Sequence, residues 1–518
     1  MFVVHPIIKD STIESRRYQE TITKKALTGN TLVVAPTALG KTVIAVLEAA
    51  ERLRLFSESS VLMLSPTRPL VNQHSNSFRR FLDLPEESIN AFTGHTPPIE
   101  REDLWRTSTV VCATPQVVKN DLANGRYALT NTSLVIFDEA HRCTGDYPYS
   151  LIAHEYMETS KWPLILGLTA SPGSEKSKID EVKERLHIEN IEIRTDGDPD
   201  VKPYVKGMRV DWKHVTLPEP MVKIQSLLNE LLRKRVKSLR SMGAQISPEP
   251  NVSKKDLLAL RQKIQEKLSE EEAPMLYSML SGVVACINLS HASELLETQG
   301  LGTLIKYFER LQKQKTRAAK GLLKEARFIR AMRLAENFSS EINHPKLNAL
   351  LDVIRDEAAH DKRIIVFAHY RDSAEMITTE LRKLEGIKPV RFVGQASKES
   401  DKGLSQKEQL EILEDFRGDV YNVLVATSVA EEGLDIPKVD LVVFYEPVPS
   451  EIRSIQRRGR TGRARAGKVV ILMTKGTRDE GVYWSSYHKE RRMRRILQEL
   501  KEDYEPESGQ RALKDFSG

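Results

Sequence analysis

Residues 31–53 read TLVVAPTALGKTVIAVLEAAERL, which is an apolar run, a loop of small residues and a stretch of helical character. The run TLVVAPT (31–37) is rich in β-branched residues and predicts a buried strand, whereas VIAVLEAAERL predicts a helix. Between them, APTALGKT (35–42) has the composition of a loop that turns backbone N–H groups toward phosphates, at the positive dipole end of the following helix. The stretch therefore predicts the strand–loop–helix unit of an α/β domain that binds a nucleotide.

The side chains of this loop have separate predicted roles. Gly40 lets the backbone turn inward, Lys41 reaches the β- and γ-phosphates, and Thr42 binds magnesium. Ala35 stands where the standard pattern has a glycine, so the pattern is not strict. The candidate ATP-binding loop comprises Pro36, Thr37, Ala38, Leu39, Gly40, Lys41 and Thr42.

Short β-rich runs of the same kind recur in two halves of the chain, and each ends in a polar, glycine- or proline-containing loop. The runs of the first half are VLMLSPT (61–67), STVVCATP (108–115), LVIFDEAH (134–141) and LILGLTASP (164–172). Those of the second half are RIIVFAHY (363–370), PVRFVG (389–394), NVLVATS (422–428), LVVFYEP (441–447) and KVVILMT (468–474). Strands that alternate with helices predict parallel sheets covered on both faces, with functional residues at the carboxyl ends of the strands.

Helical spacing replaces the strand signals between the two halves. This segment is also basic: residues 221–340 hold 21 Lys and Arg against 12 Asp and Glu, while the whole chain has a net charge of +6. A polyanion-binding module on a near-neutral body has such an asymmetry. We predict four regions: 1–210 (ATP-binding α/β domain), 211–342 (helical, basic insertion), 343–485 (second α/β domain) and 486–518 (helix and tail).

An acidic pair and an arginine cluster extend the prediction of an ATPase. In FDEAH (137–141), Asp138 is placed to hold magnesium and Glu139 to accept a proton from the attacking water. QRRGRTGR (456–463) holds four arginines, which either bind nucleic-acid backbone or meet the γ-phosphate when the two α/β domains close. The acidic pair next to a phosphate loop favours the second interpretation for some of them.

These motifs, in this order, resemble the superfamily 2 helicases, and the chain is identified as a member on them. The motifs are IESRRYQE (13–20), APTALGKT (35–42), PTRPLVNQH (66–74), ATPQV (113–117), DEAH (138–141), TAS (169–171), FAHYRDSA (367–374), ATSVAEEGLDIP (426–437) and QRRGRTGR (456–463). Within that superfamily, the chain resembles the archaeal fork-processing Hef helicases and their Fanconi anaemia M relatives. The segments that carry this likeness are FTGHTPP (92–98), DVKPYV (200–205), HPKL (344–347), RFVGQAS (391–397) and KGLSQKEQ (402–409).

The resemblance implies two RecA-like parallel-sheet motor domains around a helical insertion, and it assigns further site residues. Gln19 and Arg16 would read the adenine, while Gly433 and Asp435 would approach the nucleotide. Arg460 and Arg463 would contact the γ-phosphate, and Gln456 would lie nearby. For Arg457 and Arg458, two roles remain: contact with DNA, or exposure on a solvated face. His141, Thr169 and Ser171 would link hydrolysis to strand movement.

Two groups of residues are predicted to contact nucleic acid. The resemblance places a strand path along Thr67, Arg68, Thr93, Gly94, Thr114, His369, Gly394, Gln395 and Thr427. Lys306, Arg310, Lys313, Arg317, Lys320, Lys324 and Arg327 step by three or four, as one helical face would, and favour binding of duplex or junction backbone. Tyr307 and Phe308 are expected in the core. Phosphate contacts of this kind fix register without reading sequence.

The expected function is an ATP- and Mg²⁺-dependent DNA helicase or translocase on branched or forked DNA, of 3′–5′ polarity by resemblance. The alternatives are an ATPase stimulated by double-stranded RNA, and a nucleic-acid scaffold that ATP merely switches. Hef proteins of many archaea continue into a nuclease, and no such pattern is present, so nuclease activity is not expected. A sliding clamp or nuclease partner follows by analogy only. Three scattered cysteines, no apolar run near ~18 residues and no leader favour an intracellular, cytoplasmic protein without a membrane partner.

Overall fold

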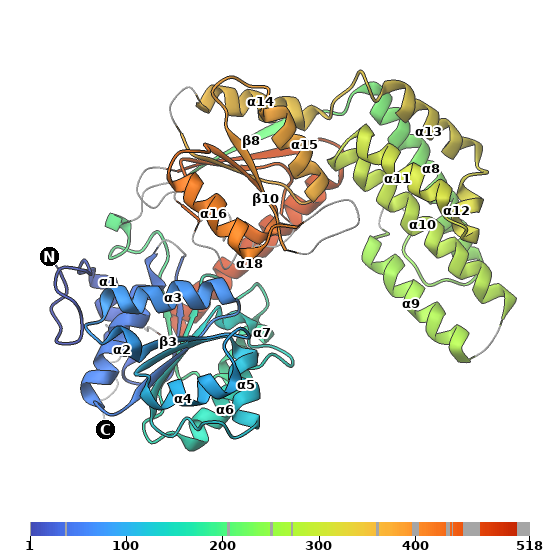
Figure 1. Ribbon diagram of the computed structural model, residues 1–518. Helices are drawn as coiled ribbons and strands as arrows, with labels where there is room; N and C mark the ends of the chain where they lie inside the picture. The colour runs from blue at the N-terminus through green and yellow to red at the C-terminus, as the bar shows by residue number, and fades with distance from the viewer. Residues whose placement is uncertain are drawn as a thin grey trace, which may run out of the picture.

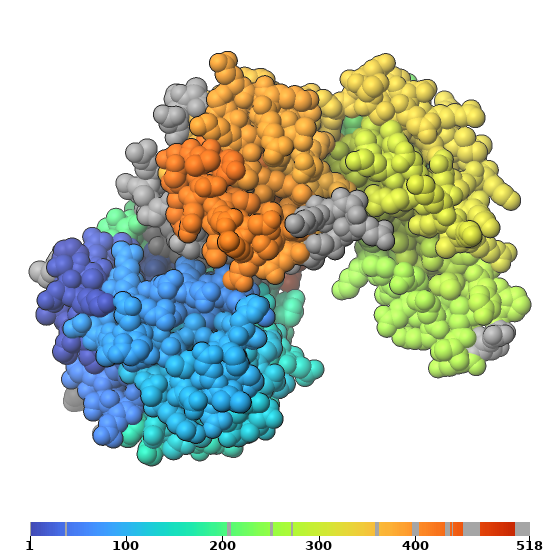
Figure 2. All heavy atoms as spheres, viewed as in Figure 1, coloured from blue at the N-terminus to red at the C-terminus, as the bar shows by residue number. Residues whose placement is uncertain are grey.

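The computed structural model describes residues 2–36, 39–204, 208–248, 252–270, 273–358, 362–395, 403–430, 436–437, 439–448 and 467–504. Within these ranges the chain forms two parallel β-sheets covered by helices, and a helical bundle beside the second sheet (Figure 1). The predicted fold class is therefore confirmed. In Figure 2 the first domain, the second domain and the bundle stand as three bodies, and an open concavity separates the bundle from the first domain.

The first sheet has seven parallel strands in the order β3-β4-β2-β5-β6-β1-β7. The strands are β1 (Thr31–Val34), β2 (Ser60–Leu64), β3 (Ile89–Phe92), β4 (Val110–Ala113), β5 (Thr132–Asp138), β6 (Ile165–Thr169) and β7 (Asn190–Ile193). The helices are α1 (Arg17–Ala26), α2 (Lys41–Leu55), α3 (Arg68–Phe81), α4 (Pro98–Thr107), α5 (Pro115–Ala123), α6 (Tyr149–Thr159) and α7 (Lys176–Arg185). Short 3₁₀ turns cover Glu86–Ser88, Ala140–Arg142 and Lys202–Tyr204.

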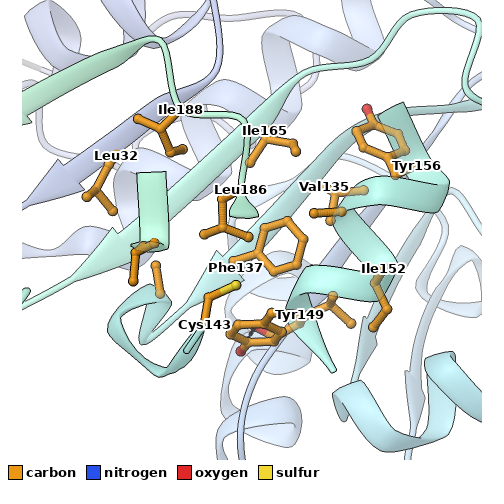
Figure 3. Packing of buried hydrophobic residues seen from close by; sticks show 14 of the residues in the cluster. Leu32, Val135, Phe137, Cys143, Tyr149, Ile152, Tyr156, Ile165, Leu186 and Ile188 are labelled. Atoms are coloured by element: carbon orange, nitrogen blue, oxygen red, sulfur yellow. Dashed lines mark hydrogen bonds between the residues drawn. The ribbon is translucent and has the colours of Figure 1, made fainter. Parts of the chain in front are cut away.

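Both faces of this sheet are buried, because successive side chains of each strand point to opposite sides. Val135 and Phe137 of β5 enter a cluster with α6 and α7, while Leu134 and Ile136 enter a cluster with α1, α2 and α3. Figure 3 shows the first cluster, in which Phe137 packs edge-on against Tyr149 at 4.9 Å between ring centroids. Strands that are apolar on both faces read as continuous hydrophobic runs, which is why the sequence revealed them.

The second sheet has six parallel strands in the order β10-β11-β9-β12-β13-β8. They are β8 (Met208–Val215), β9 (Ile364–Phe367), β10 (Pro389–Phe392), β11 (Val423–Ala426), β12 (Leu441–Phe444) and β13 (Gly467–Thr474). Its described helices are α14 (Pro345–Ala358), α15 (Arg371–Leu381) and α16 (Gln406–Arg417), and a 3₁₀ turn covers Ser428–Ala430. The expected boundary at 210/211 is wrong in one respect: β8, which straddles it, pairs with β13 over eight residues and belongs to the second sheet.

The insertion consists of α8 (Glu219–Ser241), α9 (Lys254–Glu270), α10 (Pro274–Thr298), α11 (Leu301–Lys313), α12 (Arg317–Leu322) and α13 (Ala326–Phe338). Its core is formed by leucines such as Leu228, Leu289 and Leu304 from three of these helices. Among the described helices, α10 is long and apolar enough to cross a membrane by length and composition alone, which the sequence analysis did not anticipate. It packs against α8, α9, α11 and α12 in the centre of the bundle.

A long helix, α18 (Arg478–Tyr504), returns from the second domain to the first (Figure 1). It starts eight residues before the expected boundary at 486. Met493, Ile496 and Leu497 belong to the same buried cluster as Ile191 of β7, and Lys501 pairs with Asp198 at 2.6 Å. The first domain is thus completed by residues that lie some 300 positions later in the chain.

Candidate nucleotide site and nucleic-acid surfaces

The phosphate loop joins β1 to α2 and is braced by α1. Gly40 is the N-cap of α2 with φ 69°, a left-handed conformation that favours glycine. The carbonyl of Leu39 accepts hydrogen bonds from the Tyr18 hydroxyl at 2.7 Å and from Gln19 Nε2 at 3.0 Å. A Cβ on Gly40 would lie 2.9 Å from Gln19 Nε2, so the loop and the predicted adenine-reading residue are packed as one unit.

The two predicted phosphate and magnesium ligands begin α2. Lys41 is 9% exposed, and its ammonium donates to the carbonyl of Ala35 at 3.0 Å. Thr42 follows it at the same end of the helix, where the positive end of the helix dipole favours an anion. Arg16, the other predicted adenine contact, pairs with Glu14 at 3.1 Å and lies 5.2 Å from the ring centre of Tyr204.

Asp138 ends β5 and is held by a histidine that sequence reasoning did not select. Asp138 Oδ2 lies 2.9 Å from Nε2 of His74, which is on α3, and both side chains are buried. Burial opposes ionisation of Asp138, but the hydrogen bond and charge of His74, together with Lys41, outweigh it and hold the pKa of Asp138 below its ordinary value. The carboxylate is therefore charged, as a magnesium ligand must be.

A hydrogen-bonded chain runs from the DEAH segment to β6. His141 Nδ1 lies 3.0 Å from Thr169 Oγ1, which donates to the carbonyl of Ser171 at 2.9 Å and accepts from its backbone N–H at 3.1 Å. Ser171 Oγ in turn lies 2.8 Å from Met493 Sδ of α18. The structure thus brings together the three predicted coupling residues and extends them to the helix from the second domain.

Glu139 has a side-chain oxygen that is ready for a ligand. The residue adopts a left-handed φ of 49°, and its Oε2 is buried without a hydrogen-bond partner among the described residues, 3.3 Å from His141 Nδ1. Within the described ranges no three His, Cys, Asp or Glu side chains form a metal cage. Mg²⁺ does not need one, since it binds through one or two protein ligands plus phosphates and waters. The residues present therefore fit a nucleoside triphosphate with Mg²⁺.

Part of the predicted site cannot be placed. Thr37, Ala38, Gly433, Asp435, Gln456, Arg457, Arg458, Arg460 and Arg463 lie outside the described residues. The predicted nucleotide-site residues that are described are Arg16, Gln19, Pro36, Leu39, Gly40, Lys41, Thr42, Asp138 and Glu139.

The predicted strand contacts follow adjacent strands in each sheet. Thr67, Arg68, Thr93, Gly94 and Thr114 follow β2, β3 and β4, which are neighbours in the first sheet. His369, Gly394, Gln395 and Thr427 follow β9, β10 and β11, which are neighbours in the second sheet. Each set therefore gathers at one carboxyl edge of its sheet, where open α/β sheets bind ligands.

The basic residues of the insertion do not form one helical face, which corrects the prediction. Lys306, Arg310 and Lys313 lie on α11, Arg317 and Lys320 on α12, Arg327 on α13, and Lys324 between the last two helices. The chain turns after Lys313, and the Thr316 hydroxyl caps α12 by accepting from the backbone N–H of Ala319. Spacing by three or four residues alone does not detect such a break.

Some of the predicted residues still lie together around one hollow of the bundle. Lys315, Arg317, Lys320, Gly321 and Lys324 line an open hollow of about 410 Å³, and Lys315 was not among the predicted residues. We call these five residues, together with Lys306, Arg310 and Lys313, the basic surface. Arg327 is turned to an ion pair with Glu230 at 2.9 Å and is not part of it. Tyr307 and Phe308 pack in the core, as predicted.

Three family descriptions match consecutive parts of the chain. "DEAD/DEAH box helicase" matches residues 16–179, and "Helicase conserved C-terminal domain" matches residues 345–465. "Putative ATP-dependent RNA helicase, helical bundle" matches residues 221–342. Because helicase families cover most strands of both sheets, the chain is an ATP-dependent helicase by family, and such domains bind ATP.

Curated relatives match nearly the whole chain. The chain is 42% identical over 502 residues to "Putative ATP-dependent RNA helicase MJ1505" of Methanocaldococcus jannaschii, covering 96% of this chain and 63% of that protein. It is 33% identical over 482 residues to "ATP-dependent DNA helicase mph1" of Neurospora crassa, covering 90% and 41%. It is 33% identical over 508 residues to "Fanconi anemia group M protein homolog" of Mus musculus, covering 90% and 25%. The chain thus spans between a quarter and under two thirds of the length of these relatives.

A solved structure has the same architecture. The crystal structure of the Pyrococcus furiosus Hef helicase domain matches with a TM-score of 0.75 and 48% identity, covering 93% of this chain and 100% of that one. With its two parallel-sheet domains, its helical bundle and these relatives, the chain belongs to the superfamily 2 helicases of the Hef and Fanconi anaemia M type.

Proposed function

We propose that the chain is an ATP-dependent DNA helicase or translocase of 3′–5′ polarity that remodels branched DNA, such as stalled forks and four-way junctions. The observation that carries the proposal is the hydrogen-bonded chain from His141 through Thr169 to Ser171 and α18. It joins the predicted hydrolytic residues to a helix rooted in the second domain. A scaffold that only binds nucleic acid does not need that connection.

In this proposal Lys41 and the α2 N-terminus bind the phosphates, and Thr42 and Asp138 hold Mg²⁺. A Mg²⁺ ion held there would supply positive charge next to the transferred phosphoryl group. Glu139 accepts the proton of the attacking water through its buried carboxylate oxygen. Arg460 and Arg463 are proposed, from the sequence motif, as the cations that complete the site when the domains close. The predicted domains 1–210, 211–342, 343–485 and 486–518 are part of this proposal, with β8 moved to the second α/β domain and the C-terminal helix beginning at Arg478. Gly433, Asp435 and Gln456 are proposed as further nucleotide contacts.

The basic surface supports a branched substrate. A single strand crossing the carboxyl edges of both sheets accounts for the strand contacts, whereas the basic surface lies on a separate body. Each phosphate contact that it makes releases counterions and adds affinity without sequence preference. A branch has a duplex arm to place there.

The motor assignment is tested with Lys41→Ala in the whole chain. We expect ATP hydrolysis and strand displacement to be abolished while fork binding in a gel-shift assay stays the same, because no fork contact is removed. Strand displacement by the variant at the wild-type rate would refute the motor assignment.

An RNA-stimulated ATPase is the second candidate, because one relative and the family of the bundle carry RNA helicase in their names. ATP hydrolysis should be compared with forked DNA, linear duplex DNA, single-stranded DNA and double-stranded RNA at equal phosphate and salt concentration, since affinities depend on salt. Stronger stimulation of ATP hydrolysis by the RNA duplex than by forked DNA would favour the RNA-stimulated ATPase over the DNA helicase. An intracellular, DNA-associated location, and a clamp or nuclease partner by analogy, are proposed on the same basis.

A further inference from the structure

Two carboxylates in the last turns of α10 join the insertion to the second domain. Glu297 is 4% exposed; its Oε1 accepts from Gln225 Nε2 of α8 at 2.8 Å, and its Oε2 accepts from the backbone N–H of Arg478 at 3.0 Å. Arg478 is the first residue of α18, so an insertion side chain satisfies an N-terminal N–H group of that helix. The guanidinium of Arg478 donates back to Ser290 Oγ of α10 at 3.1 Å.

One turn earlier, Glu294 holds the loop before α15. Its Oε1 accepts from the Tyr370 hydroxyl at 2.6 Å, and its Oε2 accepts from Lys254 Nζ of α9 at 2.8 Å. Burial opposes ionisation of Glu294, but hydrogen bonds from His291, Lys254 and Tyr370 outweigh it and hold its pKa well below the ordinary range. The charged carboxylate therefore ties two helices of the insertion to Tyr370.

The re-entry of the chain into the second domain is fixed at the same joint. His344 Nε2 lies 2.9 Å from the carbonyl of Glu297, and the buried Lys346 pairs with Asp479 of α18 at 2.5 Å. Asp479 also accepts from the backbone N–H of Thr474 at the end of β13 at 2.9 Å. Because a buried charge that loses its partner is costly, the pair of Lys346 and Asp479 opposes separation of the re-entering chain from the start of α18.

This joint contacts two parts of the molecule that a helicase uses: the proposed strand contacts beside Tyr370, and the helix α18 that connects the two motor domains. Tyr370 directly follows His369, a proposed strand contact, and it precedes Arg371, whose guanidinium donates to the carbonyl of Gly394 at 2.7 Å. The second function is the connection between the two motor domains. The first residue of α18, Arg478, donates its backbone N–H to Glu297, and Met493 of the same helix packs in the core of the first domain next to Ser171. A displacement of α10 would therefore move both the strand contacts and the helix that spans the two motor domains.

We propose that Glu294 and Glu297 are positioning residues that transmit the load of a DNA branch on the insertion to the motor. Glu294 acts through Tyr370 on the strand contacts, and Glu297 acts through α18 on the separation of the two domains. The proposal rests on the proposed function, since it takes the branch to be bound by the insertion. It assigns the preference for branched over single-stranded DNA to this joint rather than to the basic surface alone.

The test compares Glu294→Gln, Glu297→Gln and Tyr370→Phe with the exposed control Glu266→Gln on α9. For each protein, ATPase kcat and KM are measured without nucleic acid, with single-stranded DNA and with a fork. We expect basal and single-strand-stimulated kcat within about twofold of wild type, fork binding without ATP also within about twofold, and fork-stimulated kcat reduced about tenfold in the three joint variants. Thermal melts identify any variant that fails to fold. If a glutamine variant does not fold, the fork-stimulated kcat of Tyr370→Phe tests the proposal, because this change removes only the hydroxyl that donates to Glu294.

A second measurement does not depend on the substrate. Spin labels at Lys263→Cys on α9 and Thr379→Cys on α15, both exposed positions, report the distance between insertion and second domain. We expect one narrow distance in the wild-type background and a broad distribution with Glu294→Gln. Unchanged distances, or an unchanged fork-to-single-strand ratio of kcat in all three variants, would overturn the coupling. If the wild-type protein shows no preference for forks, the proposed function is refuted instead. The spin-label distances then show independently whether Glu294 fixes the insertion to the second domain.

Discussion

Glu48 gives the first domain an unusual dependence of stability on pH. It lies on α2 directly after the phosphate loop, is fully buried, and neither carboxylate oxygen has a hydrogen-bond partner among the described residues. Burial raises its pKa from 4.5 to about 8, and the charge of Arg52 offsets this only in part. The folded protein therefore keeps this proton between pH 4.5 and pH 8, whereas the unfolded chain releases it. Stability from this group is complete below pH 4.5 and is lost as the pH rises through 8.

Glu48→Gln removes this ionisation, and the magnitude follows from the two pKa values. Since a pKa difference is worth about 1.4 kcal/mol per unit, wild type should lose about 3 kcal/mol relative to the variant between pH 5 and pH 8. For a domain of this size that corresponds to a change of about 6–12 °C in the Tm difference. Any cost of burying the glutamine amide is independent of pH and cancels from the slope.

The assay is thermal unfolding followed by circular dichroism at half-unit steps from pH 5 to pH 8, for wild type, Glu48→Gln and the exposed control Glu58→Gln. We expect the Tm of Glu48→Gln to rise relative to wild type with pH, and that of Glu58→Gln to run parallel to wild type. A Tm difference between wild type and Glu48→Gln that is constant with pH would refute the reasoning, because Glu48 would then carry the same charge in both states.

Further outcomes follow from other buried groups. Burial, and then the charge of Lys346, lowers the pKa of His344 to about 3. Between pH 7 and pH 5 the unfolded chain therefore binds a proton that the folded protein does not, and wild type should lose about 2 kcal/mol of unfolding free energy from this residue. His344→Gln should not show this loss when urea unfolding is measured at both pH values. Leu497→Ala should destabilise the first domain by about 2–4 kcal/mol because it opens a cavity under α18, while the exposed neighbour Gln498→Ala should change urea unfolding little. All three thiols are buried and free, so they should react with a thiol reagent at the rate of unfolding rather than at once, which a stopped-flow titration with and without urea will show.

The sequence predicted the fold because its central strands are buried on both faces. VLML and LVIF appear as unbroken apolar runs, and the motifs at their ends lie where parallel strands gather ligands. The strands β3, β7 and β8 were missed, and all three lie at sheet edges, where polar residues such as Asn90 and Glu192 interrupt the run. For β8, only its long-range pairing with β13 shows the sheet to which it belongs.

Short motifs named candidate site residues such as Gly40, Lys41 and Asp138, and the structure places them at the start of α2 and the end of β5; their roles stay predictions. His74 was overlooked because its partner Asp138 is 64 positions away and no spacing rule links them. The polar joint of the insertion was invisible for the same reason, since Glu297 and Arg478 are 181 positions apart. The prediction of one basic helical face was wrong, because a spacing of three and four residues cannot show that α11 ends at Lys313.

The return of α18 changes what counts as the first motor domain. A fragment that stops at the end of β7 leaves Ile191 and Ile193 without the side chains of Met493, Ile496 and Leu497 that cover them. During synthesis more than 290 further residues must leave the ribosome before α18 can cover the β7 edge of the first sheet. In the finished protein two segments join the two sheets, the segment that leads into β8 and the helix α18. Two connections restrict the relative positions of the two domains more than a single linker would.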